Sequence, residues 1–252
     1  MLRQRYVDLH LYKNMGRAFE FRKARKMKRW SNMSKTFTRI GREIIIAVKE
    51  SGPDPSSNSR LRAIIQNAKA ANMPKDNIER AIKKASEKSS ENFKEVLLEG
   101  YAPHGIAILV EAATDNNNRT VANIRSYFNK CDGSLATSGS VDFLFDHLCF
   151  FQIKDQGIDI EELELDLIDF GVIELSKLEN EISITARFED FGSIQKELER
   201  RGLEISSSEF EREAKINKNL TEDERLKVER LINMIDEDED VQNVYHDMKT
   251  IV

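Results

Sequence analysis

The order of helix-type and strand-type periodicity constrains the fold of this chain more than any other feature. Between residues 148 and 210, four short apolar segments have strand-like patterns and two others have apolar residues at helical spacing. Their order is strand, helix, strand, strand, helix, strand, which is that of a ferredoxin-like unit. The predicted strands are residues 149–153, 172–178, 182–188 and 203–210, and the predicted helices are residues 160–168 and 191–201.

One helix and one strand remain after this complete unit. Residues 221–235 have a helical pattern that opens with a capping box, and residues 241–246 form a strand-like run. Because neither can bury its apolar face alone, we expect them to return to a sheet that begins earlier in the chain. The earlier elements are predicted strands at residues 96–101, 106–111 and 141–145, a turn at residues 102–105 and a helix at residues 120–130.

The amino-terminal part of the chain has helical periodicity only. Apolar residues recur at helical spacing in residues 31–51, 59–72 and 74–86, with a cap expected at Ser59 and a stop at Gly52. The sequence therefore predicts an α+β protein: an amino-terminal three-helix bundle followed by two α/β domains, the second (ferredoxin-like) inserted into the first. The predicted boundaries are a disordered extension at 1–14, a basic helical domain at 15–90, an α/β domain at 91–147 plus 211–252, and the inserted domain at 148–210.

Charge is distributed very unevenly along the chain. Residues 1–84 contain 21 Lys and Arg against 7 Asp and Glu, a net charge of +14, whereas residues 85–252 contain 18 against 37, a net charge of −19. A basic module on an acidic body is typical of a protein that binds a polyanion. The alternative is a solvated helical surface, or a helical bundle used for contacts with proteins.

The basic residues of the helical module are the candidate phosphate contacts. Within residues 31–51, Lys35, Arg39, Arg42 and Lys49 fall at i, i+4, i+7 and i+14, so they form one stripe that can follow a row of phosphates. The full predicted set is Arg22, Lys23, Arg25, Lys26, Lys28, Arg29, Lys35, Arg39, Arg42, Lys49, Lys75, Lys83 and Lys84.

A polar loop at residues 115–120 adds two further candidates. Arg119 and Asn117 would lie at the start of a helix, where backbone N–H groups attract phosphate and amide groups can bond bases or sugars. The alternative is that Asn117 or Asn118 only caps the helix. The acidic run at residues 236–240 is interpreted as a solvated loop, with a weak cation site as the less favoured alternative.

Motifs of catalysis, metal binding and membrane insertion are not found in the sequence. There is no phosphate-binding loop, dinucleotide fingerprint, nucleophile elbow or zinc-protease motif, and the four His and two Cys lack ligand spacing. No apolar run approaches the roughly 18 residues of a membrane span. We therefore expect a cytoplasmic protein that is not an enzyme, has no cofactor or metal and has no membrane partner; the sequence gives no oligomeric state.

Five segments have a recognisable combination of residues: 72–84 (NMPKDNIERAIKK), 99–111 (EGYAPHGIAILVE), 114–120 (TDNNNRT), 139–145 (GSVDFLF) and 240–245 (DVQNVY). Together they resemble the YebC/PmpR family, which includes mitochondrial translational activators of a cytochrome oxidase subunit. The resemblance covers about residues 16–250 and implies a cytoplasmic protein with one helical and two α/β domains. It further implies either a DNA-binding transcriptional regulator or a translation factor at the ribosome.

The combined prediction is a nucleic-acid-binding regulator of gene expression, with a DNA-binding transcriptional regulator as the first choice. A ribosome-associated translation factor that binds ribosomal RNA is the alternative, and a scaffold without a nucleic-acid partner is a weaker third. The basic residues do not separate the first two, because phosphate contacts carry no sequence information.

Overall fold

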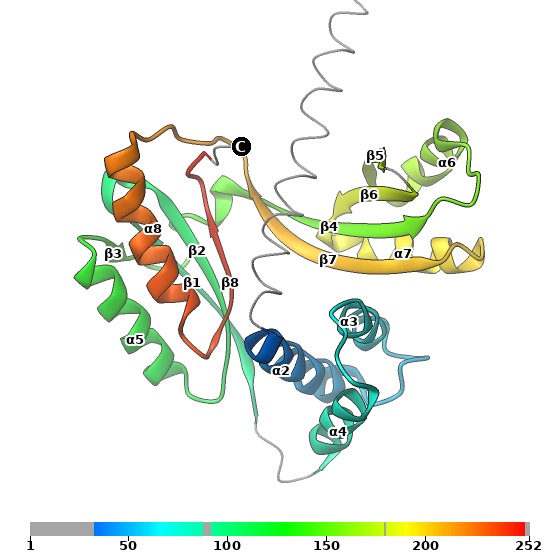
Figure 1. Cartoon of the computed structure of the whole chain (residues 1–252), viewed down its shortest axis with the longest axis horizontal. Coiled ribbons are helices and arrows are strands. Elements are labelled where there is room, and N and C mark those ends of the chain that lie inside the picture. The colour runs from blue at the N-terminus through cyan, green and yellow to red at the C-terminus, as the bar shows by residue number, and fades with distance from the viewer. Residues whose placement is uncertain (1–32, 88–91, 179, 250–252) are drawn as a thin grey trace, which may run out of the picture.

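The computed structural model describes residues 33–87, 92–178 and 180–249. Three helices come first and form a small bundle (Figure 1). They are α2 (Met33–Ser51), α3 (Ser59–Ala70) and α4 (Lys75–Ser86). Their shared core contains Ile44 and Leu61, which are fully buried, and Ile78. The predicted extension at residues 1–14 lies outside the described residues.

The connection between α2 and α3 is organised by one buried asparagine rather than by the predicted serine. Asn58 caps α3: its Oδ1 accepts from the N–H of Leu61 at 2.9 Å, so the cap expected at Ser59 was wrong by one residue. The Nδ2 of Asn58 also donates to the carbonyls of Ala47 and Gly52, both at 2.8 Å. One side chain thereby satisfies backbone groups of both helices.

The first sheet contains the last strand of the chain, as predicted. Its order is β3-β1-β2-β8, and β8 runs antiparallel to β2 with Val110 opposite Val244. The helices α5 and α8 contribute to the core on one face of this sheet. The bounds are β1 (Lys94–Tyr101), β2 (Ala107–Thr114), α5 (Asn117–Lys130), β3 (Ser134–Leu135), α8 (Glu222–Asp236) and β8 (Val241–His246).

The strand predicted at residues 141–145 was wrong. Residues Asp142–Leu144 form a short 3-10 turn instead, and a strand begins only at Phe145. The cause is Glu99, a buried carboxylate that accepts from the N–H groups of Val141 at 2.6 Å and Asp142 at 3.0 Å. Burial alone would raise the pKa of Glu99, but these backbone hydrogen bonds lower it. Backbone groups held by a side chain are not available to a ladder of strands.

The second sheet has the predicted ferredoxin-like topology. Its order is β5-β6-β4-β7, with every neighbouring pair antiparallel. The strands β4 and β7 also connect this inserted domain to the first sheet (Figure 1). The bounds are β4 (Phe145–Lys154), α6 (Ile160–Leu167), β5 (Val172–Leu178), β6 (Glu181–Arg187), α7 (Phe191–Arg200) and β7 (Ile205–Ala214).

The helical bundle contacts both α/β units. On one side, α3 packs on β7: the Oδ1 of Asn67 accepts from the N–H of Ser208 at 3.1 Å, its Nδ2 donates to the Ser208 carbonyl, and Ala63 joins the core of the inserted domain. On the other side, α2 lies against the turn between α8 and β8 (Figure 1). The bundle therefore has a defined position against the acidic body.

A candidate nucleic-acid interface

The turn that joins α8 to β8, residues 236–240, is bonded to both α2 and α5. Its aspartates and glutamates alternate: Asp238 and Asp240 are only 8% and 3% exposed, whereas Glu237 and Glu239 are exposed. The Asp238 Oδ1 accepts from the N–H of Asp240 at 3.0 Å, which closes the turn. The interpretation of this run as a solvated loop was therefore wrong, and we call residues 236–240 the acidic turn.

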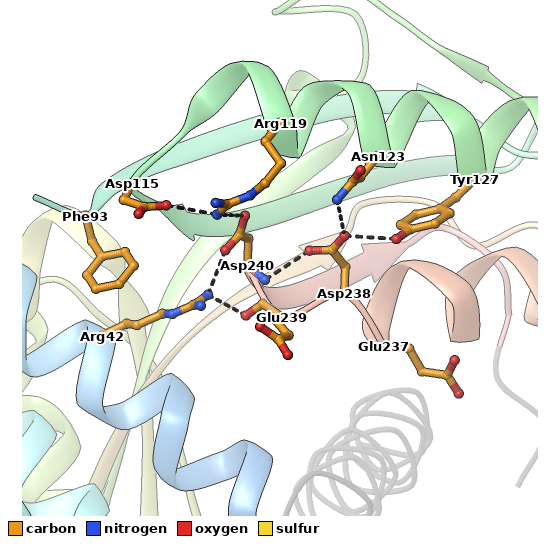
Figure 2. Close-up of a pocket in the computed structure, with 10 residues that line it drawn as sticks. All are labelled: Arg42, Phe93, Asp115, Arg119, Asn123, Tyr127, Glu237, Asp238, Glu239 and Asp240. Carbon is orange, nitrogen blue, oxygen red and sulfur yellow. Dashed lines mark hydrogen bonds and ion pairs between the residues drawn. The ribbon is translucent and has the colours of Figure 1, made fainter. Parts of the chain in front are cut away.

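Asp240 occupies the centre of this arrangement (Figure 2). One carboxylate oxygen accepts from Arg119 Nη2 and Thr120 Oγ1, each at 2.8 Å, and from Thr114 Oγ1 at 3.1 Å. The other oxygen accepts from Arg42 Nη1 at 3.1 Å. Burial alone would raise the pKa of Asp240, but the hydrogen bonds from Arg119 and the two threonines lower it. The carboxylate thus joins α2 to the start of α5 as a charged group.

Asp236 holds the first half of the basic stripe on α2. Arg39 Nη2 lies 2.9 Å from Asp236 Oδ1 and 3.1 Å from its carbonyl oxygen, and Arg39 Nε donates to the Val241 carbonyl at 3.0 Å. Lys35 Nζ donates to the Asp236 carbonyl and lies 3.4 Å from its Oδ2. Burial opposes ionisation of Asp236, but Arg39 and then Lys35 lower its pKa. Arg39, only 6% exposed, is a structural cation.

Asp238 connects the acidic turn to α5. Its Oδ2 accepts from Tyr127 Oη at 3.0 Å and from Asn123 Nδ2 at 3.2 Å. Burial, the hydrogen bond and the negative charge of Asp238 together raise the pKa of Tyr127. The phenol therefore stays protonated and keeps donating at neutral pH.

These groups surround an open cavity of about 600 Å³ between α2, α5 and the acidic turn (Figure 2). Its lining residues are Arg42, Phe93, Asp115, Arg119, Asn123, Tyr127, Glu237, Asp238, Glu239 and Asp240. Both guanidiniums are already bonded to Asp240, and Arg42 also lies 5.0 Å from the centre of the Phe93 ring. Carboxylates outnumber guanidiniums in the lining, so its charge disfavours a phosphate. Among the described residues, no cluster of His, Cys, Asp and Glu has a metal-binding arrangement.

The polar loop before α5 is divided between a cap and an ion pair. Asn116, rather than the predicted Asn117 or Asn118, caps α5, since its side chain accepts from the N–H of Arg119 at 3.2 Å. Arg119 also lies 2.9 Å from Asp115 Oδ1, and its side chain remains 47% exposed. Asn117 is exposed in the first helical turn. The structure thus holds Arg119 against the chain and leaves Asn117 facing solvent.

Lys49, at the end of the stripe on α2, and the predicted lysines of α4 have a different environment. Lys49, Lys75, Lys83 and Lys84 are exposed, the last three on α4. Arg80, which sequence reasoning did not select, is also exposed on α4 and lines a groove of about 350 Å³ between α2 and α4, together with Lys84 and Arg42. Lys75, Arg80, Lys83 and Lys84, called the α4 face below, lie opposite the buried Ile78 and Ala85.

The α4 face has a positive end. Asp76 and Glu79 share the amino-terminal half of the helix, and Lys75 lies 3.4 Å from Glu79. Arg80, Lys83 and Lys84 therefore concentrate positive charge in the carboxyl-terminal half, where the helix dipole also favours cations. The six other predicted residues, Arg22, Lys23, Arg25, Lys26, Lys28 and Arg29, lie outside the described residues.

Comparison with known proteins gives the family. Residues 17–88 match the family described as the TACO1/YebC protein N-terminal domain, and residues 93–248 match the TACO1/YebC second and third domain. This chain belongs to the TACO1/YebC family. The resemblance predicted from five sequence segments is thereby confirmed over residues 17–88 and 93–248.

Relatives within the TACO1/YebC family are similar over nearly their whole lengths. A "Probable transcriptional regulatory protein" of Flavobacterium johnsoniae is 68% identical over 93% of this chain and 99% of its own length. A protein of the same name from Porphyromonas gingivalis is 58% identical over 93% of this chain and 98% of its own. Both names describe a transcriptional regulatory protein.

A solved structure is also similar. The crystal structure of a conserved hypothetical protein, Aq1575 of Aquifex aeolicus, has a TM-score of 0.70 and 37% identity, and covers 86% of this chain and 90% of that one. This similarity agrees with the mixed α/β fold described above. In the described ranges, no helix combines the length and apolar character needed to cross a membrane.

Proposed function

We propose that this TACO1/YebC protein binds nucleic acid through the α4 face and Lys49, together with the basic run at residues 22–29, and acts in the cytoplasm. Duplex DNA is the proposed target, in line with the transcriptional name of the relatives. The observation that carries the proposal is the exposure of Arg80, Lys83 and Lys84 on one helix. Residues three and four apart on a helix lie about 5–6 Å from each other, so these cations can reach neighbouring phosphates.

The remaining predicted residues receive a different role in this proposal. Lys35, Arg39 and Arg42 hold the helical bundle against the acidic turn, and Arg119 holds the other side of the same turn. They position the α4 face and make no direct phosphate contact. Asn117 is exposed and stays a candidate contact. The acidic body would repel nucleic acid elsewhere on the molecule and so confine binding to the basic side.

Salt-dependent binding by the full chain tests this proposal. The variant K75E/R80E/K83E/K84E removes the α4 face, and the matched control K130E/K196E/K227E/R230E reverses four exposed cations on the body. Fluorescence anisotropy with a labelled DNA duplex gives log K against log salt. Loss of four phosphate contacts should flatten the slope by about 3.6, from about 0.9 per contact. The control changes net charge equally and should keep most of the slope.

The same measurement separates the competing functions. Tighter binding of a ribosomal RNA fragment than of duplex DNA, at one salt concentration, would favour the ribosome-associated alternative. Equal slopes for the α4 variant and its control would overturn the α4 assignment. If neither nucleic acid binds in a salt-dependent way, the proposal is wrong and the scaffold without a nucleic-acid partner is favoured.

A further inference from the structure

A different surface, at the far edge of the inserted domain, combines exposed apolar side chains with an excess of negative charge. Leu165 on α6 is 72% exposed, Ile168 in the following 3-10 turn is 61% exposed, and Ile173 at the start of β5 is 55% exposed. The three residues lie on adjoining elements, because α6 and the 3-10 turn after it pack against β5. Single exposed apolar residues are ordinary on protein surfaces, whereas several large ones close together are typical of interaction sites.

The helix presents these residues because its core face is already satisfied. Leu163 and Leu167 are buried at 4% and 0% exposure in the core of the inserted domain. Leu165 lies between them in sequence, about 200° away around a helix of 3.6 residues per turn, so it points away from that core. Ile168 follows Leu165 at i+3 and shares its face. This outward side has its own apolar stripe.

The adjoining strand contributes a free sheet edge. β5 is the last strand of the order β5-β6-β4-β7, and its pairing with β6 is irregular between Val172 and Glu174, which places Ile173 at a bulge. Bulges and charges at an edge discourage pairing with an identical sheet. The opposite edge strand, β7, is contacted by Asn67 of α3. The two edges of one sheet are therefore treated differently.

The charge around the apolar residues identifies what can bind them. Residues 159–174 contain seven acidic residues and no basic one: Asp159, Glu161, Glu162, Glu164, Asp166, Asp169 and Glu174. Asp166 is engaged by Arg201 at 2.6 Å, whereas Glu161, Glu162, Glu164 and Asp169 are exposed. A nucleic acid or an anionic membrane would be repelled, and a second copy would bring like charges together.

We propose that the α6–β5 face, defined by Leu165, Ile168, Ile173 and the surrounding carboxylates, docks a basic amphipathic segment of a partner protein. Apolar side chains of the segment cover the three exposed residues, and its Lys and Arg meet the carboxylates at the rim. Apolar contact supplies the affinity, while complementary charge supplies orientation and association rate. This surface lies in a different domain from the α4 face, so the protein can hold nucleic acid and a protein partner at separate sites.

A synthetic peptide probes this face on the full chain. The probe is an 18-residue helix with Leu on one side and Lys on the other, and the same peptide with Glu in place of Lys is the control. Binding of each peptide is measured by fluorescence anisotropy and is mapped by the amide chemical shifts of the protein. The variant L165S/I168S/I173S removes the apolar group, and M33S/I216S/L226S changes three other exposed apolar residues. A second variant, E161Q/E164Q/D169N, removes charge without altering apolar contacts.

We expect the Lys peptide to shift amides of α6 and β5 and the Glu peptide to leave them unchanged. L165S/I168S/I173S should weaken binding of the Lys peptide at least tenfold, and M33S/I216S/L226S should weaken it less than twofold. Binding of the Lys peptide to E161Q/E164Q/D169N should lose most of its salt dependence. Equal binding by both apolar variants, or shifts elsewhere, would overturn the proposal. Dimerisation of the chain alone, abolished by L165S/I168S/I173S in sedimentation, would assign the face to a second copy and overturn it too.

Discussion

The basic side chains of two helices in the same bundle, α2 and α4, lie in different environments. On α2, Lys35, Arg39 and Arg42 turn inward to the acidic turn of the same chain, whereas Lys75, Lys83 and Lys84 on α4 face solvent. Both helices are amphipathic and rich in cations, so neither charge nor spacing separates them. The difference depends on carboxylates about 200 residues away. The α2 cations are therefore used within the fold, and the proposed binding surface is assigned to the exposed cations of α4.

The sharpest test of this contrast is to remove one cation from each helix. Arg39→Ala removes the donor to the buried carbonyl of Val241 and one of the two cations bonded to Asp236, and should destabilise the protein by about 3 kcal/mol. Lys83→Ala, on exposed surface, should change stability by no more than about 0.5 kcal/mol. Urea unfolding of both variants measures the difference. Similar losses would contradict the division between a structural α2 and a surface α4.

Lowering the pH should remove the folding stability that the ion pairs of α2 contribute. It should not change the small contribution of the exposed α4 cations. The pKa values of Asp236 and Asp240 are lowered in the folded protein, so the unfolded chain binds their protons first as pH falls. Their stabilisation is therefore complete above the ordinary carboxyl pKa of about 3.9 and is lost as pH falls through the lower folded values.

Urea unfolding of the wild type and of D236N/D240N, at pH 6 and pH 3, measures this loss. At pH 6 the wild type should have a clearly larger free energy of unfolding than D236N/D240N. At pH 3 this difference should be smaller. K83A should differ equally little from the wild type at both pH values. A constant gap for D236N/D240N would show that the two carboxylates act through packing and not through charge.

A smaller effect is expected at the loop that supports the acidic turn from the other side. Asn116→Ala removes the cap of α5, the helix that carries Arg119 and Thr120 to Asp240, and should cost about 1 kcal/mol. Asn117→Ala alters an exposed side chain, and its effect should stay within about 0.5 kcal/mol. Thermal unfolding compares the two, and a greater loss in N117A would contradict the observed cap.

The smallest effect on stability should come from the α6–β5 face. L165S/I168S/I173S changes three exposed side chains, on α6, the following 3-10 turn and β5, so the melting temperature should fall by no more than about two degrees. Differential scanning calorimetry measures it. A large fall would mean that these residues support the inserted domain itself.

The spacing of apolar residues along the sequence was sufficient to predict most of the fold. It was not sufficient to predict the contacts of the acidic turn. Alternating residues and the leftover helix and strand correctly predicted the ferredoxin-like order and the return of β8 to the first sheet. The strand predicted at residues 141–145 failed because Glu99, 42 residues away, takes the N–H of Val141. The interpretation of the acidic turn as a solvated loop was wrong for the same reason, because its cationic partners lie in α2 and α5, far from it in sequence. Interactions between distant residues leave no periodic signal.

One contact on α2 also sets the order in which this molecule can be completed. Arg39 donates to the carbonyl of Val241, 202 residues later in the chain. Translation at about 5–20 residues per second separates these two residues by roughly 10–40 s. The three helices can pack on one another during that interval, but their anchor in the acidic turn does not yet exist. Each newly made chain therefore passes through a period in which Lys35, Arg39 and Arg42 are uncovered cations, and folding of the acidic turn ends it.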